Sequence, residues 1–322
     1  MTEKRSGEFS WIAKHFAPLA GAGSFGLRDD AALLRADGPL VVTQDTIVEG
    51  VHFFADDAPR DVALKAIGVN ASDIVAKGST PIGFTLGLGV PDRWRDADVA
   101  DFADGLLEYA DSTHAITNGY PVIVLLGGDT TRSPGGLFVS VTMFGRPGER
   151  YVSREGARPG DTIVVCGTIG DGYLGLLMRR GDVAPADGPL ERYLRPAPAF
   201  QVAPVVASKA SAAMDVSDGL VGDLAKLAAA SGVRCEIDLG EVPLSVDGRA
   251  YVDGDRDRFP ALATGGDDYV VLMTVPAANM KAVRTALGTR ASTIGHVFEG
   301  EGIGVSLDGV PLNLGATSYT HD

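Results

Sequence analysis

Residues 61–90 read DVALKAIGVNASDIVAKGSTPIGFTLGLGV and contain two different patterns. In residues 61–77 the apolar positions recur at helical spacing, which predicts an amphipathic helix. Its apolar side contains Val62, Ala66, Val69 and Ile74. Gly78 ends the helix, and residues 84–90 form an apolar run that Pro91 stops. Such a run is typical of a buried strand, so the stretch predicts a helix that leads into a sheet.

The same alternation continues along the rest of the chain. Further strands are predicted at residues 30–34, 40–43, 122–126, 137–144, 162–166 and 269–275. Further helices are predicted at residues 6–16, 97–111, 219–231 and 281–287. Because strands and helices interleave in both halves, the fold class is α/β or α+β. Glycine, proline and charge accumulate in residues 145–160, which predicts two domains, 1–148 and 149–322.

The composition excludes several classes of partner. The chain has 322 residues and a formal charge of −14, from 28 Lys and Arg against 42 Asp and Glu. We therefore expect no binding to nucleic acid or to an anionic membrane. Cys166 and Cys235 are too few for a disulfide framework or a zinc cluster. The polar N-terminus resembles no signal peptide, and no apolar run approaches the ~18 residues of a spanning helix, so we expect a cytoplasmic protein.

Aspartates recur beside glycine and small hydroxyl residues, mostly at the ends of apolar segments. They are Asp29, Asp30, Asp45, Asp73, Asp129, Asp215, Asp218, Asp267 and Asp268. Each has a structural explanation, because aspartate commonly caps helices and turns, and Asp73 could pair with Lys77 one turn later. As a converging set, however, two carboxylates about 4 Å apart would repel by roughly 4 kcal/mol at an effective dielectric constant of 20. Converging carboxylates need cations, and aspartates on loops suit Mg²⁺ together with substrate phosphates.

The common nucleotide-binding signatures are absent from the sequence. There is no G-x-x-x-x-G-K-[ST] loop and no protein-kinase signature set. Residues 167–172 (GTIGDG) follow a strand and open a helix, but they do not match G-x-G-x-x-G and fit a tight turn better. The triplet Gly-Gly-Asp occurs at residues 127–129 and again at 265–267, which is too short to establish a duplication.

Several segments, taken in order, resemble the thiamine-monophosphate kinase family. They are DDAAL at 29–33, QDTIVEGVHF at 44–53, KAIGVNASD at 65–73, GGDTTR at 127–132, MDVSDGL at 214–220 and GGDDY at 265–269. The resemblance spans nearly the whole chain, and GEF at residues 7–9 adds to it. The wider superfamily includes aminoimidazole ribonucleotide synthetase, selenophosphate synthetase and a hydrogenase maturation factor, all of which use ATP. Residues 48–53 and 127–132 favour the thiamine kinase within that group.

The resemblance implies a two-domain aminoimidazole ribonucleotide synthetase-like fold, with mixed sheets flanked by helices, and a homodimer. It implies phosphorylation of thiamine monophosphate to thiamine diphosphate with ATP and Mg²⁺. The implied Mg²⁺ ligands are Asp30, Thr43, Asp45, Asp73, Asp129, Asp215 and Asp218. The implied ATP contacts are Gly128, Asp129, Arg154 and Ser217, and the implied contacts to thiamine phosphate are His52 and Asp267. Asp129 and Asp218 are the candidates for indispensable catalytic residues.

Three positions depart from the family pattern. Gln44 stands where threonine is frequent, so a metal contact at this position is in question. Asp267 stands where glutamate is usual, and its carboxylate is one methylene shorter. Ala316 takes the place of an aromatic residue near the C-terminus, where Tyr319 is the nearest ring. Stacking on the thiazole or pyrimidine ring is therefore in question.

Three other functions are compatible with parts of the sequence. A different ATP-dependent member of the superfamily would share the metal chemistry and differ in the acceptor. A non-catalytic protein that binds Ca²⁺ or nucleotide could use Asp-Gly loops, although no EF-hand pattern is present. A dinucleotide-dependent oxidoreductase would have to use the turn at 167–172, which lacks the required fingerprint.

Overall fold

The computed structural model describes residues 7–116 and 123–314. The chain separates into two compact units. The first contains Met1–Ile74 and Thr80–Arg146, and the second contains Val75–Ser79 and Pro147–Asp322. In the described part of the chain, no helix has the length and apolar character needed to cross a membrane.

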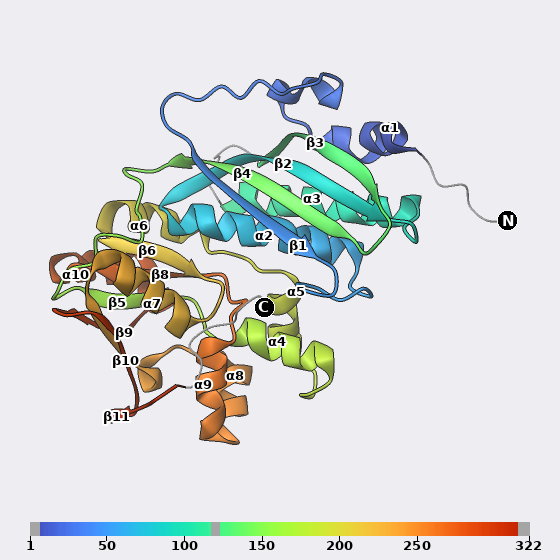
Figure 1. Ribbon diagram of the computed structural model, residues 1–322. Helices are drawn as coiled ribbons and strands as arrows, with labels where there is room; N and C mark the ends of the chain where they lie inside the picture. Colours follow the sequence, from blue (N-terminus) through green and yellow to red (C-terminus); the bar gives the residue numbers. More distant parts are fainter. Residues whose placement is uncertain (1–6, 117–122, 315–322) are drawn as a thin grey trace. The chain divides into compact units, whose positions relative to one another are not determined.

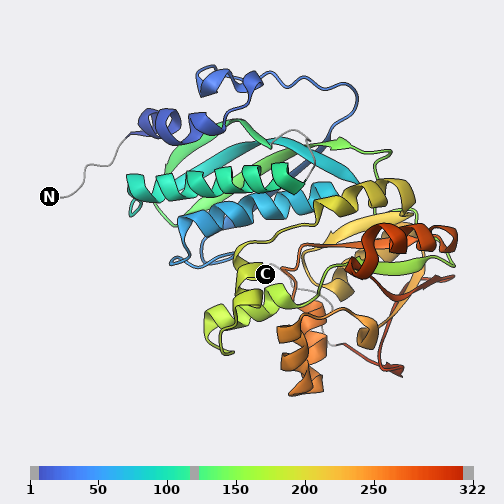
Figure 2. The ribbon, with the colours of Figure 1, turned by 180° about the vertical axis from the view of Figure 1, so that it is seen from behind.

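The first unit is built on a four-stranded sheet in the order β1-β4-β2-β3. The strands are β1 (Val41–Val48), β2 (Ser79–Pro91), β3 (Val124–Ser133) and β4 (Phe138–Pro147). Helices α2 (Pro59–Ala76) and α3 (Asp96–Ile116) cover one face (Figures 1 and 2). In β4, Val139, Val141 and Met143 are fully buried while the alternate residues are partly exposed, because successive side chains of a strand point to opposite faces.

The N-terminal segment is attached to this sheet. It consists of the helix α1 (Glu8–Trp11), a π-helix (Ile12–Phe16) and two 3₁₀ segments (Ala17–Leu19 and Ala22–Leu27). The Ser24 hydroxyl donates to the carbonyl oxygen of Leu125 in β3 at 2.7 Å, and the indole N–H of Trp11 donates to Asp96 at 2.8 Å. The segment is therefore held against the edge strand β3 and the start of α3.

The second unit contains a seven-stranded sheet in the order β11-β10-β7-β9-β5-β8-β6. Its strands are β5 (Thr162–Cys166), β6 (Ala212–Val216), β7 (Arg234–Asp238), β8 (Val270–Val275), β9 (Ala291–Phe298), β10 (Gly302–Leu307) and β11 (Val310–Pro311). Its helices are α4 (Asp171–Arg180), α5 (Asp187–Leu194), α6 (Ala203–Lys209), α7 (Leu220–Ser231), α8 (Val246–Asp253), α9 (Phe259–Thr264) and α10 (Met280–Leu287).

Both faces of the second sheet are covered by apolar packing. In the central strand β5, Ile163 and Val165 belong to one buried cluster, whereas Val164 and Cys166 belong to another. All five residues of β5 are buried. This explains why residues 163–166 form a continuous apolar run rather than an alternating one.

Most of the predicted elements are confirmed, with shifted ends. The helices predicted at 61–77, 97–111, 219–231 and 281–287 and the strands at 84–90, 137–144, 162–166 and 269–275 are present. The prediction at 6–16 is confirmed as a helix over residues 8–16, of which 12–16 are π-helical.

In the first unit, one predicted strand is wrong and two others are longer than predicted. Residues 30–34 form no strand, because this segment is mainly exposed and bonds locally: the N–H of Asp30 donates to the side chain of Asp29, and that of Leu33 to Gly23. The strands predicted at 40–43 and 122–126 are present as β1 and β3, but both continue past their aspartates, and residue 122 lies outside the described residues. Asp45 and Asp129 lie within β1 and β3, since both strands continue their ladders through these residues.

Candidate active site

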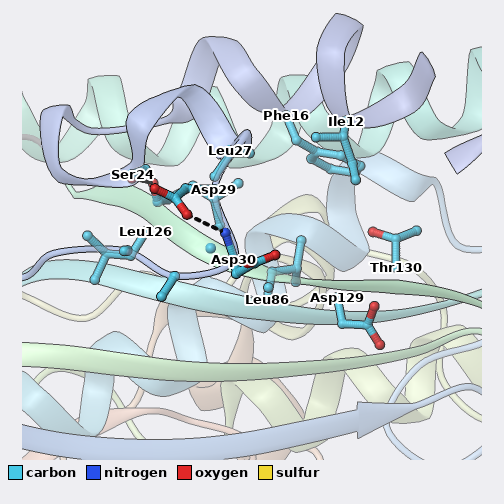
Figure 3. A pocket seen from close by; sticks show the side chains of 15 residues that line it. Ile12, Phe16, Ser24, Leu27, Asp29, Asp30, Leu86, Leu126, Asp129 and Thr130 are labelled. Carbon is cyan, nitrogen blue, oxygen red and sulfur yellow. Dashed lines mark hydrogen bonds between the residues drawn. The ribbon is translucent and has the colours of Figure 1, made fainter. Parts of the chain in front are cut away.

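A pocket in the first unit collects residues from the N-terminal segment, from the irregular segment that follows it, and from strands β2 and β3 (Figure 3). Ile12 and Phe16 come from the π-helix, Ser24 and Leu27 from the 3₁₀ segment Ala22–Leu27, and residues 29–32 from the irregular segment that follows, while β2 and β3 supply the rest. The complete lining is Ile12, Phe16, Ser24, Leu27, Asp29, Asp30, Ala31, Ala32, Leu86, Leu125, Leu126, Gly127, Gly128, Asp129 and Thr130. Three of the predicted functional residues, Asp30, Gly128 and Asp129, therefore line one cavity.

Gly128 lets β3 pass close to β2 at this pocket. Its φ angle is +156°, and a Cβ atom at this position would lie 2.0 Å from the carbonyl oxygen of Leu86. No larger residue fits there without moving one of the two strands. The next residue, Asp129, is exposed on β3 opposite Gly87. The carboxylate therefore sits on a strand whose position is fixed by its glycine neighbour.

A second group of predicted ligands lies where β1 packs against α2. The Thr43 hydroxyl donates to Asp73 Oδ2 at 2.5 Å. One step along β1, the backbone N–H of Asp45 donates to the side-chain oxygen of Asn70 in α2 at 3.0 Å. Thr43 and Asp45 both point to the α2 side, because they are two residues apart on a strand.

His52 lies in a tight turn after β1. The backbone N–H of Val48 donates to His52 Nδ1 at 3.1 Å. Since Nδ1 accepts a hydrogen bond, the neutral ring carries its proton on Nε2. Glu49 in the same turn accepts from the N–H of Leu137 at 2.8 Å and forms an ion pair with Arg93. The turn is thus anchored to residues that precede β4 and follow β2.

In the second unit, the predicted residues gather around the loop between β6 and α7. Asp215 is buried in β6, and Ser217 and Asp218 follow it. The N–H groups of Ser217 and Asp218 both donate to Asp223, at 2.9 and 3.0 Å. Lys226 bridges Asp223 and Asp218, at 2.8 and 2.5 Å. Burial raises the pKa of the Asp223 carboxyl, and the two carboxylates outweigh burial and raise the pKa of Lys226.

The segment 265–269 lies beside this loop. The N–H of Asp267 donates to the carbonyl oxygen of Ser217 at 2.8 Å, and Asp267 has a φ angle of +66°. The next residue, Asp268, is buried and accepts N–H bonds from Gly170 (2.8 Å) and Gly172 (3.1 Å). Burial raises the pKa of Asp268 to about 8. The segment therefore connects the two loops at the N-terminal ends of α4 and α7.

Arg154 occupies a different kind of position. Its side chain is exposed, and its carbonyl oxygen accepts from the Ser231 hydroxyl at 2.9 Å. Its neighbour Ser153 accepts an N–H bond from Ala213 in β6. This backbone contact keeps Arg154 close to the strand that carries Asp215.

The sequence did not single out three residues around these loops as candidate site residues. Asp223 and Lys226 were not singled out, and Asp268 was noted only as one of many aspartates. A signal for Asp223 exists: it shares the helical face of Leu220, Leu224 and Leu227, which is otherwise apolar. A carboxylate on the buried face of a helix indicates a partner that compensates its charge.

The donor atoms fit a hard divalent cation. Among residues 7–116 and 123–314, no group of three or more His, Cys, Asp or Glu side chains is arranged to hold a metal ion. Mg²⁺ needs no such cage, because it commonly uses one or two carboxylates and completes its octahedron with water and substrate phosphates. Asp30 and Asp129 on one pocket and Thr43 beside Asp73 offer oxygen ligands of this type. The Mg²⁺ ligand set stays a prediction.

Comparison with known proteins assigns the chain to a family. Residues 28–146 match the N-terminal domain of AIR synthase related proteins, and residues 158–308 match the C-terminal domain. The thiamine-monophosphate kinase of Caulobacter vibrioides is 40% identical, over 98% of this chain and 90% of that protein. The chain belongs to the thiamine-monophosphate kinase family. The thiamine-monophosphate kinase of Escherichia coli K12 is 36% identical, over 98% of both chains.

The structures of the thiamine-monophosphate kinase family agree with the fold described above. AaThiL complexed with AMPPCP and TMP has a TM-score of 0.76 and 29% identity, covering 99% of this chain and 100% of that chain. The family resemblance and the mixed α/β fold class predicted from sequence are therefore confirmed. Ala316 and Tyr319, the positions considered for the family's C-terminal aromatic residue, lie outside the described residues.

Proposed function

We propose that the protein transfers the terminal phosphoryl group of ATP to the phosphate of thiamine monophosphate, giving ADP and thiamine diphosphate. The observation that carries this proposal is the alignment of thiamine-monophosphate kinases over 98% of the chain at 40% and 36% identity. The AaThiL structure with AMPPCP and TMP supports a direct transfer between the two substrates. The site also contains no Ser–His–Asp arrangement among its named residues, which suits a reaction without a covalent enzyme intermediate.

The chemistry asks for positioning and charge neutralisation more than for a general base. The nucleophile is a phosphate oxygen that is already anionic at neutral pH, so no strong base has to remove a proton. The residues that would hold Mg²⁺ are Asp30, Thr43, Asp45, Asp73, Asp129, Asp215 and Asp218. When bound, Mg²⁺ supplies positive charge against the phosphates and the charge that develops on the transferred group.

The remaining residues bind and orient the substrates. Gly128, Asp129, Arg154 and Ser217 would contact ATP, directly or through the metal. His52 would contact the acceptor through its Nε2–H, because Nδ1 is occupied by the N–H of Val48. Asp267 would accept a hydrogen bond from the acceptor, and its backbone is fixed by the bond to Ser217. In this proposal residues 1–148 bind ATP and Mg²⁺ and form the dimer, while residues 149–322 complete the site.

We also propose a homodimer that uses the face of the first sheet opposite α2 and α3. Val42, Gln44, Thr46 and Val48 alternate as exposed residues along β1, with Val42 exposed by 55%. The side chains of Gln44 and Thr46 both donate to the Ser140 hydroxyl in β4, which links the exposed side chains of the two strands. Light scattering should give twice the mass of the 33.4 kDa chain. The cytoplasmic location stays a prediction.

A product assay tests the proposed reaction. Purified protein is incubated with ATP, Mg²⁺ and thiamine monophosphate, with EDTA as control, and thiamine diphosphate is measured by chromatography. We expect product that disappears with EDTA. ADP formed only with another phosphorylated acceptor would reject the thiamine assignment and keep the ATP chemistry. No ATP consumption with any acceptor would favour a non-catalytic binding protein.

A further inference from the structure

A buried carboxylate ties down the loop before α7. The Asp223 side chain is fully inaccessible, and its Oδ2 accepts the N–H groups of Ser217 and Asp218 at 2.9 and 3.0 Å. Burying a carboxylate is costly unless hydrogen bonds and an opposite charge compensate it. The two N–H groups supply part of this compensation. The loop backbone is therefore bound to a carboxylate on the first turn of its own following helix.

Lys226 supplies the opposite charge and shares it with Asp218. Its ammonium nitrogen lies 2.8 Å from Asp223 Oδ1 and 2.5 Å from Asp218 Oδ2. The side chain of Asp218 is 34% exposed and that of Lys226 is 40% exposed, so solvent and ions reach this side of the cluster. Two carboxylates share one ammonium, which leaves a net negative charge at the loop.

The backbone around this loop is closely packed. A Cβ atom at Gly266 would lie 2.4 Å from the Ser217 carbonyl oxygen, and one at Gly219 would lie 2.6 Å from Thr264. The N–H of Asp267 also donates to that carbonyl oxygen. The lysine side chain, by contrast, has four flexible methylene groups and an exposed end. A change of cation at Asp218 is therefore easier through movement of Lys226 than through movement of the loop.

We propose that Lys226 is the resident counter-ion of Asp218, held in place by Asp223, and that a divalent cation binding at Asp218 must displace the lysine ammonium. This inference rests on the proposed role of Asp218 as a metal ligand. Lys226 is a positioning residue that keeps the Asp218 carboxylate oriented and neutralised until a metal arrives. It thereby sets how much divalent cation the protein requires.

The test measures metal binding directly, without turnover. Mn²⁺ replaces Mg²⁺ as probe, and free Mn²⁺ is followed by electron paramagnetic resonance in solutions of the full chain without nucleotide. Lys226→Met should bind Mn²⁺ about twofold to fivefold more tightly, because the competing contact is a partly exposed ion pair. Lys226→Arg, which keeps the charge, should show less than half of that change. Lys281→Met is the matched control, since it removes one exposed charge from α10 in the same unit.

The comparison with Asp218→Asn separates this inference from the proposed function. We expect Asp218→Asn to weaken Mn²⁺ binding and to abolish the effect of adding Lys226→Met. If Asp218→Asn weakens binding but Lys226→Met does not strengthen it, the inference is overturned and the metal role of Asp218 stands. If neither variant changes binding, both are overturned, while the kinase reaction is judged by its own product assay. Two results would show that the gain in Mn²⁺ affinity comes from net charge and would reject displacement of Lys226. The first is an equal gain in Lys281→Met, and the second is an equal gain when Lys226→Met is added to Asp218→Asn.

Discussion

The triplet Gly-Gly-Asp occurs twice in this protein and adopts two different conformations. Residues 127–129 continue the strand β3, and Asp129 projects from a paired strand beside a pocket. Residues 265–267 form a loop between α9 and β8, in which Gly266 and Asp267 have φ angles of +79° and +66°. The same three residues therefore present a carboxylate from a rigid ladder in one unit and from a left-handed turn in the other.

The difference lies in the neighbours of each triplet. At the first, only Gly128 is crowded, by the carbonyl oxygen of Leu86, and a Cβ atom at Gly127 would meet nothing within 4 Å. At the second, both glycines are crowded: Gly265 by the ring of Tyr173 and Gly266 by the Ser217 carbonyl oxygen. Local sequence similarity is thus no guide to local structure, because the contacts that select each conformation come from distant parts of the chain.

The largest expected effect is on activity at the first triplet. Asp129→Asn should lower kcat by about a hundredfold or more, because it removes a charge that the proposed reaction needs. The fold should persist, since Asp129 is exposed. Steady-state kinetics measures kcat, and circular dichroism shows whether the fold persists. Asp37→Asn, an exposed aspartate in a loop, is the control and should be neutral. Near-normal turnover in Asp129→Asn would remove Asp129 from the catalytic residues.

The next effect concerns the two glycines of the first triplet. Gly128→Ala should lower the free energy of unfolding of its unit by about 3 kcal/mol, because its Cβ cannot avoid the Leu86 carbonyl oxygen. Gly127→Ala should change it by less than about 1 kcal/mol, since the space is open. Urea unfolding followed by tryptophan fluorescence compares the two. Equal stabilities would mean that β3 tolerates a side chain at both positions and that crowding does not explain the first triplet.

The smallest expected effect is on the pH dependence of stability. It compares the residues that follow the two triplets, Thr130 and Asp268. Burial raises the pKa of Asp268 from 3.8 to about 8. Between these values the folded protein keeps a proton that the unfolded chain releases. The stability that this proton contributes is complete below about pH 4 and is lost as the pH rises through about 8. Asp268→Asn cannot ionise, so its stability should fall less than that of the parent between pH 5 and 8.

Urea midpoints at several pH values test this expectation. Thr130→Val at the first triplet serves as the control, because neither residue carries a charge. Parallel pH curves for the parent and Asp268→Asn would show that burial does not raise the pKa of Asp268 in the folded protein. A steeper fall of the urea midpoint with pH in Asp268→Asn would contradict a raised pKa of Asp268 as well.

Regular elements were predictable wherever apolar periodicity is strong. The helix α2 and the strand β5 follow directly from residues 61–77 and 162–166. The apolar stretch Ala-Ala-Leu-Leu predicts a strand at residues 30–34, but Asp30, Ala31 and Ala32 line a pocket and the segment is mainly exposed. Two glycines interrupt the apolar run of β3, so the sequence predicts an end at residue 126, whereas pairing with β2 carries the strand through to Ser133.

The candidate site was only partly predictable for a related reason. Asp30, Gly128 and Asp129 were chosen from sequence, and the structure shows that they line one pocket. The place of Asp223 on an otherwise apolar helical face indicates a compensating partner, but only the structure shows that the N–H groups of Ser217 and Asp218 are part of it. Lys226 was missed because a lysine on a helix is usually a solvated charge, and its two partners become visible only when the loop is folded.

The sequence by itself determined the family, the fold class, most helices and strands, and the types of residue that carry the proposed chemistry. These features depend on composition, periodicity and the order of motifs, which are properties of the chain read in one dimension. Only the tertiary structure decided which aspartates are exposed on strands, which are buried as anchors, and which glycine must lack a side chain. Those outcomes depend on contacts between residues far apart in the chain, such as Gly128 with Leu86 and Gly266 with Ser217. Close packing, rather than local preference, selects among the conformations that a short segment allows.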